Sequence, residues 1–291
     1  MRPCVSYWGS AMIDLSARID QVPLAYVDVE TTGLSPQRGD RVCEVAILRC
    51  QGGQVLDAVQ QLVNPQRPMG AGAYAVHGIS DEMLRDAPTF DAVANDVLEL
   101  FHGAVLVGHN TPFDLAFLAA ELGLLGVSLP SFVALDTLRL ARRRVFSPSY
   151  SLGTLAASLG VEVDGQAHRA MVDVLTTRAV LQCLVEDLWA AGVRSVGDYV
   201  DAQGGPIGLK RYHPVVDVPP LILDALRRRR LLFLRYRSER GEITERIVQP
   251  LGVTDRGGCP ALVAHCHLRD AQRSFRLDRI IEMDVVETFE S

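Results

Sequence analysis

Asp28 and Glu30 stand two positions apart at the end of an apolar run that covers residues 23–27. Side chains alternate between the two faces of a strand, so this spacing puts both carboxylates on one face and Val27 and Val29 on the other. Two like charges side by side repel, and burying either one is costly. A divalent cation resolves the conflict, because hard cations such as Mg²⁺ bind carboxylate oxygens. The stretch therefore predicts a core strand that ends in a metal site, and the alternative is an exposed strand end with two solvated acids.

Two later segments hold further acids close to histidines. Asp114 follows His109 and the apolar run of residues 104–107, and His168 precedes Asp173 at the start of a long helical pattern. Each segment alone fits a simpler role, such as a helix-capping acid or a surface histidine. Together with the first pair they supply four carboxylates and a histidine.

In this order the acids and the histidine resemble the DEDDh exonucleases, the family of the proofreading subunit of bacterial DNA polymerase III and of RNase T. The resemblance covers residues from about 24 to 184 and is not confined to the acids. The family segments match this sequence at residues 28–34, 77–80, 107–110 with 113–114, 150–155, and 168 with 173. The family divides between histidine and tyrosine before the last acid, and the H-x4-D spacing here is that of the histidine branch.

The resemblance implies a 3′–5′ exonuclease that removes mononucleotides from single-stranded ends with two Mg²⁺ or Mn²⁺ ions. Asp28 would bridge both ions, Glu30 and Asp173 would bind the ion nearer the attacking water, and Asp114 would act on the other ion. Two ions in such a site clamp the attacking and the leaving oxygen. His168 would be the general base, a task that suits an imidazole near neutral pH.

The resemblance also implies a substrate side of the site. Thr31, Thr32 and Gly33 would hold the terminal nucleotide, and His77 lies in a substrate-side segment. We expect single-stranded DNA as the favoured substrate, with RNA as the alternative. Two other functions remain open: a catalytically silent nucleic-acid or nucleotide sensor, which the intact acids disfavour, and an interaction subunit that works with a polymerase or repair partner or as a homodimer.

At 291 residues the chain is long for one domain, and two are expected. We predict a nuclease domain at residues 1–190, a glycine- and proline-punctuated linker at 191–220 and a second domain at 221–291. The first is predicted as α/β, and the resemblance implies a ribonuclease H-like mixed sheet with flanking helices. Its predicted strands are 24–30, 42–50, 55–63, 104–108 and 132–135, and its predicted helices are 90–101, 113–122, 137–144, 152–159 and 170–188.

The second domain has a short helical pattern at residues 221–230 followed by several short strands, which favours a small β-barrel. Through Tyr236, Arg246, residues 250–252 and residues 275–280, the segment from about 221 to 288 resembles the WYL domain, an SH3/Sm-like barrel found in bacterial regulators and defence proteins. The tripeptide that names that domain is absent, since Pro260, Ala261 and Leu262 stand in its place. The resemblance implies binding of nucleic acid or a charged ligand, and a barrel that only dimerises or packs on the nuclease is the alternative. The candidate ligand residues are Arg246, Arg276 and Arg279.

The formal net charge of −6 is unusual for a nucleic-acid-binding protein, but the charge is unevenly distributed. Residues 1–220 hold 16 Lys and Arg against 24 Asp and Glu, whereas residues 221–291 hold 13 against 11. An acidic catalytic domain is compatible with a nucleic-acid substrate, because bound metal ions offset part of its charge.

Composition also indicates the cellular compartment in which such a chain is expected. No run of about 18 apolar residues is present, so no membrane span is expected. The first residues lack the basic start and apolar core of a secretory signal. Six cysteines are scattered without a CxxC pair, which favours buried thiols over a disulfide framework. We therefore expect a cytoplasmic protein.

Overall fold

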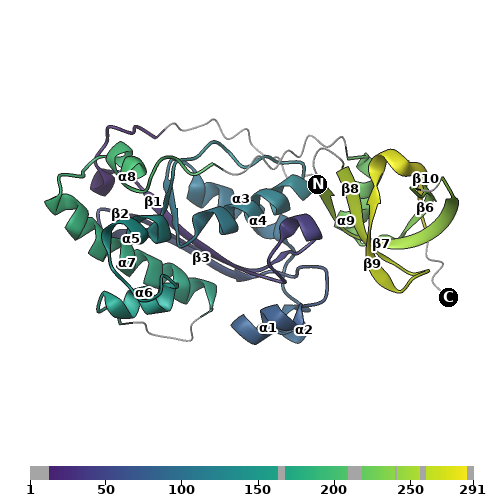
Figure 1. Ribbon diagram of the computed structural model, residues 1–291, viewed down its shortest axis with the longest axis horizontal. Coiled ribbons are helices and arrows are strands. Elements are labelled where there is room, and N and C mark those ends of the chain that lie inside the picture. Colours follow the sequence, from purple (N-terminus) through teal and green to yellow (C-terminus); the bar gives the residue numbers. More distant parts are fainter. Residues whose placement is uncertain (1–12, 163–167, 209–217, 240, 256–259, 287–291) are drawn as a thin grey trace.

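Two domains lie side by side in the computed structural model, which describes residues 13–162, 168–208, 218–239, 241–255 and 260–286 (Figure 1). The N-terminal domain is a mixed sheet with helices on both faces, and the C-terminal domain is an antiparallel sheet with one helix. The predicted α/β class of the first domain is confirmed. Within the described residues, no helix is long and apolar enough to cross a membrane.

The N-terminal sheet is built around its first strand. Strands β1 (Leu24–Thr31), β2 (Val42–Gln51) and β3 (Gln54–Leu62) lie where the sequence predicts strands, and they pair antiparallel. Strands β4 (Val105–Gly108) and β5 (Ala134–Asp136) continue the sheet in parallel on the other side, which gives the order β3-β2-β1-β4-β5. The acidic end of β1 therefore lies in the middle of the sheet, where helices from both faces reach it.

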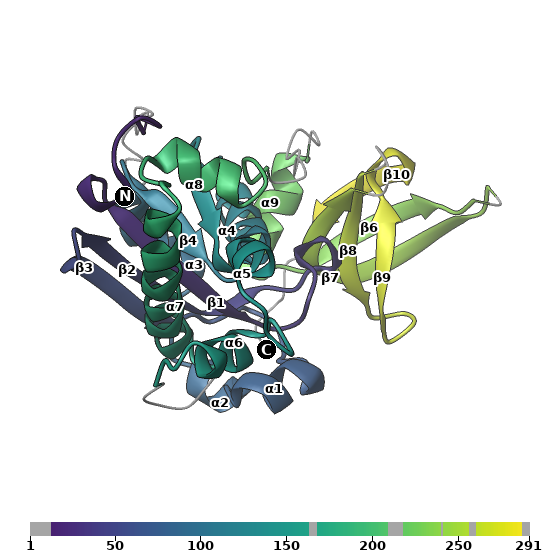
Figure 2. The same cartoon turned by 60° about the vertical axis from the view of Figure 1, so that its left-hand side comes forward.

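Helices cover the two faces of this sheet (Figure 2). One face packs on the 21-residue helix α7 (Ala170–Ala190) with α5 (Thr137–Arg144) and α6 (Leu152–Ser158). The other packs on α3 (Phe90–Phe101) and α4 (Thr111–Leu124). Each core is apolar and buried, which favours folding by roughly 25 cal/mol for each Å² of apolar surface removed from water.

Two short helices that the sequence analysis did not predict follow β3. They are α1 (Ala71–His77) and α2 (Asp81–Leu84), the second capped by the hydroxyl of Ser80. Helices this short show too few turns for an apolar period to be visible. They pack beside the carboxyl end of β1, where the ring of His77 contacts the carbonyl of Thr31.

Most of the expected linker packs on the N-terminal domain. Helix α8 (Val196–Ala202) begins with a capping box at Ser195, and its residues Val196 and Tyr199 are fully buried against the α7 side of the sheet. Ile207 enters the core on the opposite side. Residues 209–217 lie outside the described residues.

The C-terminal domain begins with α9 (Pro220–Arg228), which covers one end of a five-stranded sheet. All neighbours pair antiparallel in the order β10-β6-β7-β8-β9. The strands are β6 (Leu232–Arg237), β7 (Ile243–Asp255), β8 (Pro260–Cys266), β9 (Ala271–Arg276) and β10 (Ile280–Val285).

The structure confirms an antiparallel C-terminal sheet, and among the described residues it does not confirm that this sheet closes into the expected SH3/Sm-like barrel. Among the described residues no pairing joins β9 to β10. The 3-10 turn η3 (Leu277–Arg279) ends β9 and takes the chain across to β6, where β10 pairs instead. Both β9 and β10 are therefore edge strands of the sheet that the described residues form.

The two domains touch where helix α4 and two loops of the nuclease side, the one that holds η2 and the one that holds Asn64, meet the C-terminal domain. The turn η2 (Pro36–Arg38) packs against β7, and the side-chain amide of Gln272 donates to the carbonyl of Arg38 at 3.0 Å. The Arg229 guanidinium also donates to the side-chain oxygen of Asn64 at 2.9 Å.

The four described cysteines are free thiols, and Cys4 and Cys259 lie outside the described residues.

Candidate active site

Three carboxylates meet where β1 ends and α7 begins. One oxygen each from Asp28, Glu30 and Asp173 can be chosen so that all lie within 4.8 Å of one another. Tyr26 belongs to the α7 side of the core, whereas Val27 belongs to the opposite side, so the alternation of β1 turns both of its acids toward α7. Asp173 lies in the first turn of that helix.

The fourth acid reaches β1 from the other face of the sheet. Asp114, in the first turn of α4, is 3% exposed, and its carboxylate accepts a hydrogen bond from the backbone N–H of Val29 at 3.1 Å. It is close enough to Asp28 that its charge raises the pKa of that acid. The structure therefore brings all four predicted acids to one end of one strand.

Burial and mutual repulsion both hold protons on these acids. Burial raises the pKa of Asp28 well above its usual value, and the charges of Asp114 and Asp173 add to the effect. Burial also raises the pKa of Glu30 to about 8, with Asp173 acting in the same direction. The pKa of Asp114 and of Asp173 is likewise raised, again mainly by burial. The site concentrates more negative charge than it stabilises by itself, and its oxygen donors fit a hard divalent cation.

His168 is exposed and stands two positions before α7. Its φ of 62° places it in the left-handed region, which is uncommon for residues other than glycine and carries strain. It lies close enough to Asp173 that its charge and a backbone hydrogen bond both lower the pKa of that acid. They oppose the effect of burial, which raises it. The histidine thus lies at the edge of the acid cluster, open to solvent.

The side chains predicted to hold a nucleotide mostly make hydrogen bonds within the protein. The Thr31 hydroxyl donates to the carbonyl of Gly33 at 2.6 Å, and the Thr32 hydroxyl accepts from the backbone N–H of Arg41 at 3.0 Å. His77 is 3% exposed, its Nδ1 accepts from the N–H of Ile79, and its Nε2 lies 3.2 Å from the Thr31 carbonyl oxygen. Burial lowers the pKa of His77, which favours the neutral ring, and the two contacts let the ring brace the end of β1.

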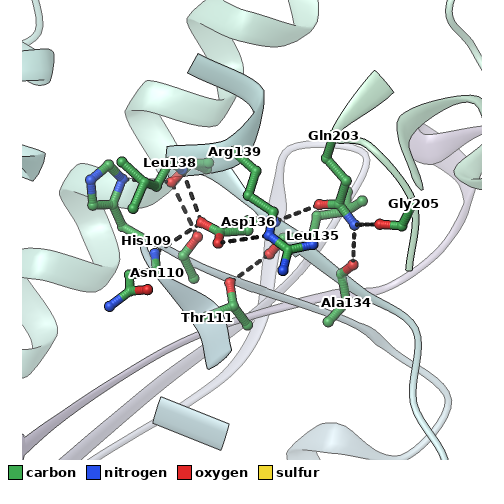
Figure 3. Close-up of polar contacts among 12 residues, drawn as sticks. His109, Asn110, Thr111, Ala134, Leu135, Asp136, Leu138, Arg139, Gln203 and Gly205 are labelled. Carbon is green, nitrogen blue, oxygen red and sulfur yellow. Dashed lines mark hydrogen bonds and ion pairs between the residues drawn. The ribbon is translucent and has the colours of Figure 1, made fainter. Parts of the chain in front are cut away.

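A second network fixes the start of α4, as Figure 3 shows. The buried carboxylate of Asp136 accepts from the backbone N–H groups of Asn110 and Leu138, which begin α4 and α5. Asn110 has a φ of 73°, a left-handed conformation that asparagine tolerates better than most residues. His109 bridges the Thr137 hydroxyl at 2.9 Å and the Tyr150 carbonyl at 2.8 Å. These contacts indicate that the matched segment of residues 107–110 with 113–114 serves as scaffolding that holds Asp114 in place.

Sequence reasoning gave no role to two residues of this region. Leu34 is the last residue of the first matched segment, 28–34, and is 85% exposed although it is a large apolar side chain. Glu44, which pairs with Glu30 across β1 and β2, is 1% exposed. The available signal for Glu44 was a single acid inside the apolar run of residues 42–48.

The C-terminal arginines do not gather at one point. Arg276 pairs with Asp278 at 2.7 Å, and Arg279 pairs with Glu239 at 3.1 Å. Arg246 lies on the face of β7 that also carries core residues, and its buried Nη1 has no hydrogen-bond partner among the described residues. The three positions therefore remain separate candidates for ligand contact.

An α/β domain that presents four acids and an exposed histidine at the end of its central strand is the architecture of a metal-dependent nuclease of the ribonuclease H-like class. The chain belongs to the RNase T exonuclease family, because residues 26–181 match the sequence profile of that family. Residues 217–285 match the profile of the WYL domain.

Curated relatives carry the same region. Over 165 residues the chain is 36% identical to the 3′-5′ exonuclease DinG of Bacillus subtilis, a match of 56% of this chain and 17% of DinG. Over 154 residues it is 40% identical to the DNA polymerase III subunit epsilon of Rickettsia prowazekii, a match of 50% of this chain and 67% of that subunit. The similarity to DinG thus spans a small part of that protein.

Solved structures confirm the fold. The nuclease domain of the DEDDh family member 3′hExo bound to rAMP is 18% identical, with a TM-score of 0.51 over 59% of this chain and 95% of that one. A structure of exonuclease I is 20% identical, with a TM-score of 0.53 over 84% of this chain and 55% of that one. At these identities the likeness establishes the fold of the chain, and the family whose fold it shares uses divalent metals.

Proposed function

We propose that this chain is a 3′–5′ exonuclease that hydrolyses single-stranded nucleic acid from its 3′ end, with DNA as the favoured substrate. The observation that carries the proposal is the convergence of Asp28, Glu30 and Asp173 within 4.8 Å, with Asp114 behind them. The names of the curated relatives, a 3′-5′ exonuclease and a DNA polymerase subunit, support both the direction and the preference for DNA.

Asp28, Glu30 and Asp173 would hold divalent metal, Mg²⁺ or Mn²⁺, and Asp114 would complete a site for two ions. When bound, such ions supply positive charge that stabilises the attacking and leaving oxygens of phosphodiester hydrolysis. Because the pKa of Glu30 is raised to about 8, its carboxyl would have to lose a proton near neutral pH in order to hold a cation.

The chain itself would contribute the base and the nucleotide contacts. His168, exposed beside Asp173, would take the proton of the attacking water. Because the hydroxyls of Thr31 and Thr32 bond within the protein, we assign nucleotide binding at residues 31–33 to the backbone. The exposed side chain of Leu34 would pack against the base of the terminal nucleotide.

The C-terminal domain would hold nucleic acid or a regulatory ligand, with Arg246, Arg276 and Arg279 as contact residues. Its position against η2 supports a regulatory role, since η2 belongs to the loop that follows Leu34. A domain that only packs on the nuclease or dimerises is the competing function, as is an interaction subunit for a polymerase or repair partner.

A digestion assay tests the proposal directly. The purified chain is incubated with 5′-labelled single-stranded DNA and RNA in Mg²⁺, Mn²⁺ or EDTA, and products are resolved at single-nucleotide length. We expect a ladder shortened from the 3′ end, more rapid with DNA, that disappears in EDTA and in Asp173→Asn. A 3′-phosphate should block it. Metal-dependent binding without hydrolysis would favour the silent sensor, and cutting of a closed circle would mean an endonuclease.

A further inference from the structure

Helix α7 presents Asp173 to the site but begins without a local cap. Arg169 occupies the N-cap position and makes no side-chain hydrogen bond to the first turn. Ser, Thr, Asp and Asn normally satisfy the unpaired N–H groups there. The residue before it, His168, is held in a left-handed conformation at φ 62°. A contact from elsewhere in the chain must therefore fix this helix start.

Glu44 of β2 makes that contact. Its carboxylate accepts from the backbone N–H of Ala170 at 3.2 Å, and from the Nε and Nη2 atoms of Arg169 at 3.1 and 2.9 Å. A negative charge at the amino end of a helix is also favoured by the helix dipole. The cap thus comes from a residue 125 positions away from Arg169.

The same carboxylate is fully occupied. The side-chain amide of Gln60 donates to it at 3.1 Å, which brings its hydrogen bonds to four. A carboxylate has about four acceptor directions, so no lone pair of Glu44 is left for a metal ion. These bonds lower the pKa of Glu44 even though burial raises it, and the group stays charged beside Glu30.

We propose that Glu44 and Arg169 form a positioning pair that sets the backbone of His168 and thereby aims its imidazole at the site. The inference rests on the proposed function, in which His168 is the base. A left-handed residue other than glycine persists only where its surroundings hold it. Arg169 is the next residue along the chain, and two parallel hydrogen bonds to a buried carboxylate leave it little freedom.

Turnover in combined variants tests the pair in the full-length chain. Glu44→Gln keeps the shape, but its amide cannot accept all four hydrogen bonds. We expect Glu44→Gln and Arg169→Gln each to lower kcat about 10–100-fold with KM changed less than about 3-fold, the usual size of an outer-shell effect. The double variant should be no more than about 3-fold slower than the slower single, because both remove one link.

The decisive background is His168→Asn, in which asparagine tolerates the left-handed backbone but is no base. There Glu44→Gln should cost less than about 3-fold, since nothing remains to be aimed. A cost as large as in the wild-type background would overturn the proposal and assign Glu44 to Asp173 or to folding. A KM raised tenfold by Arg169→Gln alone would also overturn it, because Arg169 would then touch substrate.

Imidazole NMR spectra of the metal-free protein give a readout that does not depend on activity. The His168 signals are those lost in His168→Asn, and Glu44→Gln should shift or broaden them while those of His109 stay in place. Asp187→Asn, which breaks the ion pair with Arg144 further along α7, is the matched control and should leave both unchanged. An unshifted His168 signal in Glu44→Gln would contradict the positioning role.

The two proposals fail in different ways. A wild-type chain without nuclease activity whose His168 signal still responds to Glu44→Gln would end the proposed function and keep the positioning pair. If Glu44→Gln does not fold, Arg169→Lys replaces it, since lysine keeps the charge and loses the two-pronged contact. Its His168 signal should then shift, and an unchanged signal would overturn the proposal.

Discussion

Gly39 and Gly252 lie back to back where the two domains meet. A Cβ atom on Gly252 would come within 3.1 Å of the Cα of Gly39, and one on Gly39 would lie 3.3 Å from the Leu251 carbonyl oxygen. Gly39 also has a φ of 83°, which glycine adopts without strain. The same loop returns through Arg41, whose backbone pairs with that of Thr32 at 2.9 Å. The domain contact therefore reaches the stretch proposed to bind the terminal nucleotide.

We expect Gly252→Val to separate the domains and to change the nuclease side. The added side chain meets backbone that cannot move away, and overpacking of this kind costs about 1–3 kcal/mol. Small-angle scattering should give a larger radius of gyration, and KM for a short oligonucleotide should change at least about 3-fold. Glu245→Val, at an exposed position on the same strand, is the control. Unchanged scattering together with unchanged KM would show that the contact does not couple the domains.

Without metal, the free energy of unfolding should fall as pH rises from about 6.5 to 8. The folded pKa of Glu30 is raised to about 8 from 4.5, so its contribution is complete below pH 4.5 and is lost as pH rises through 8. One such group lowers stability by up to about 1.4 kcal/mol per pH unit where only the folded state binds the proton. Asp28, whose pKa is also raised, acts in the same direction.

Urea unfolding in EDTA at several pH values measures this slope. The window starts near 6.5 because the pKa of the buried His77 and of the half-buried His109 is lowered, which makes stability rise with pH below that value. Glu30→Gln should flatten the fall, and millimolar Mg²⁺ or Mn²⁺ should stabilise the wild type most at pH 8. A flat wild-type profile in EDTA would contradict the repulsion inferred for the acid cluster.

Local sequence patterns predicted the central part of this site well. The two-residue period of β1 is enough to turn Asp28 and Glu30 to one face, and the structure places Tyr26 and Val27 in opposite cores accordingly. The long helical pattern after residue 170 likewise predicted α7, the helix that carries Asp173. These features depend on neighbours in sequence, which a periodicity analysis detects.

The sequence analysis could not predict features that depend on partners far away in the sequence. Glu44 reads as one acid in an apolar strand until the fold brings Arg169 to it. Gln203 reads as linker until its amide reaches β5. Closure of the C-terminal sheet depends on whether β9 meets β10, and no local pattern reports that register.

A fragment of residues 1–208 should fold, whereas a fragment of residues 1–194 should not be stable. The Gln203 side chain accepts from the N–H of Asp136 at 2.8 Å and donates to the Ala134 carbonyl at 2.9 Å (Figure 3). Removing α8 also uncovers core that Tyr199 fills, and losing one large buried side chain costs about 3–5 kcal/mol. Melting curves should be cooperative for the longer fragment only. A cooperative transition in the shorter one would mean that α8 is dispensable.

The 1–208 fragment also tests what the C-terminal domain holds. It should digest short oligonucleotides at about the rate of the full chain. If the C-terminal arginines bind nucleic acid, its affinity for long strands should be lower and should depend less steeply on salt, because fewer counterions are released. Fluorescence anisotropy across a salt series measures both quantities. Equal affinities and equal salt slopes would favour the packing role.

The last prediction concerns His168. His168→Asn should lose about 10²–10⁴ in turnover, the usual worth of a positioned acid–base group, and keep both KM and the stabilisation by Mn²⁺. His168→Ala should lose as much turnover with little change in stability, because histidine and alanine both carry a Cβ atom at φ 62°.

Two further variants bracket this result. Asp28→Asn should lose more turnover and also the stabilisation by metal, since it removes a member of the acid cluster. His267→Asn, which alters an exposed histidine of the C-terminal domain, should behave as wild type. Single-turnover rates with a short labelled strand separate chemistry from product release. Near-normal rates in His168→Asn would mean that bound metal alone activates the water, and His168 would then serve only to lead the chain into α7.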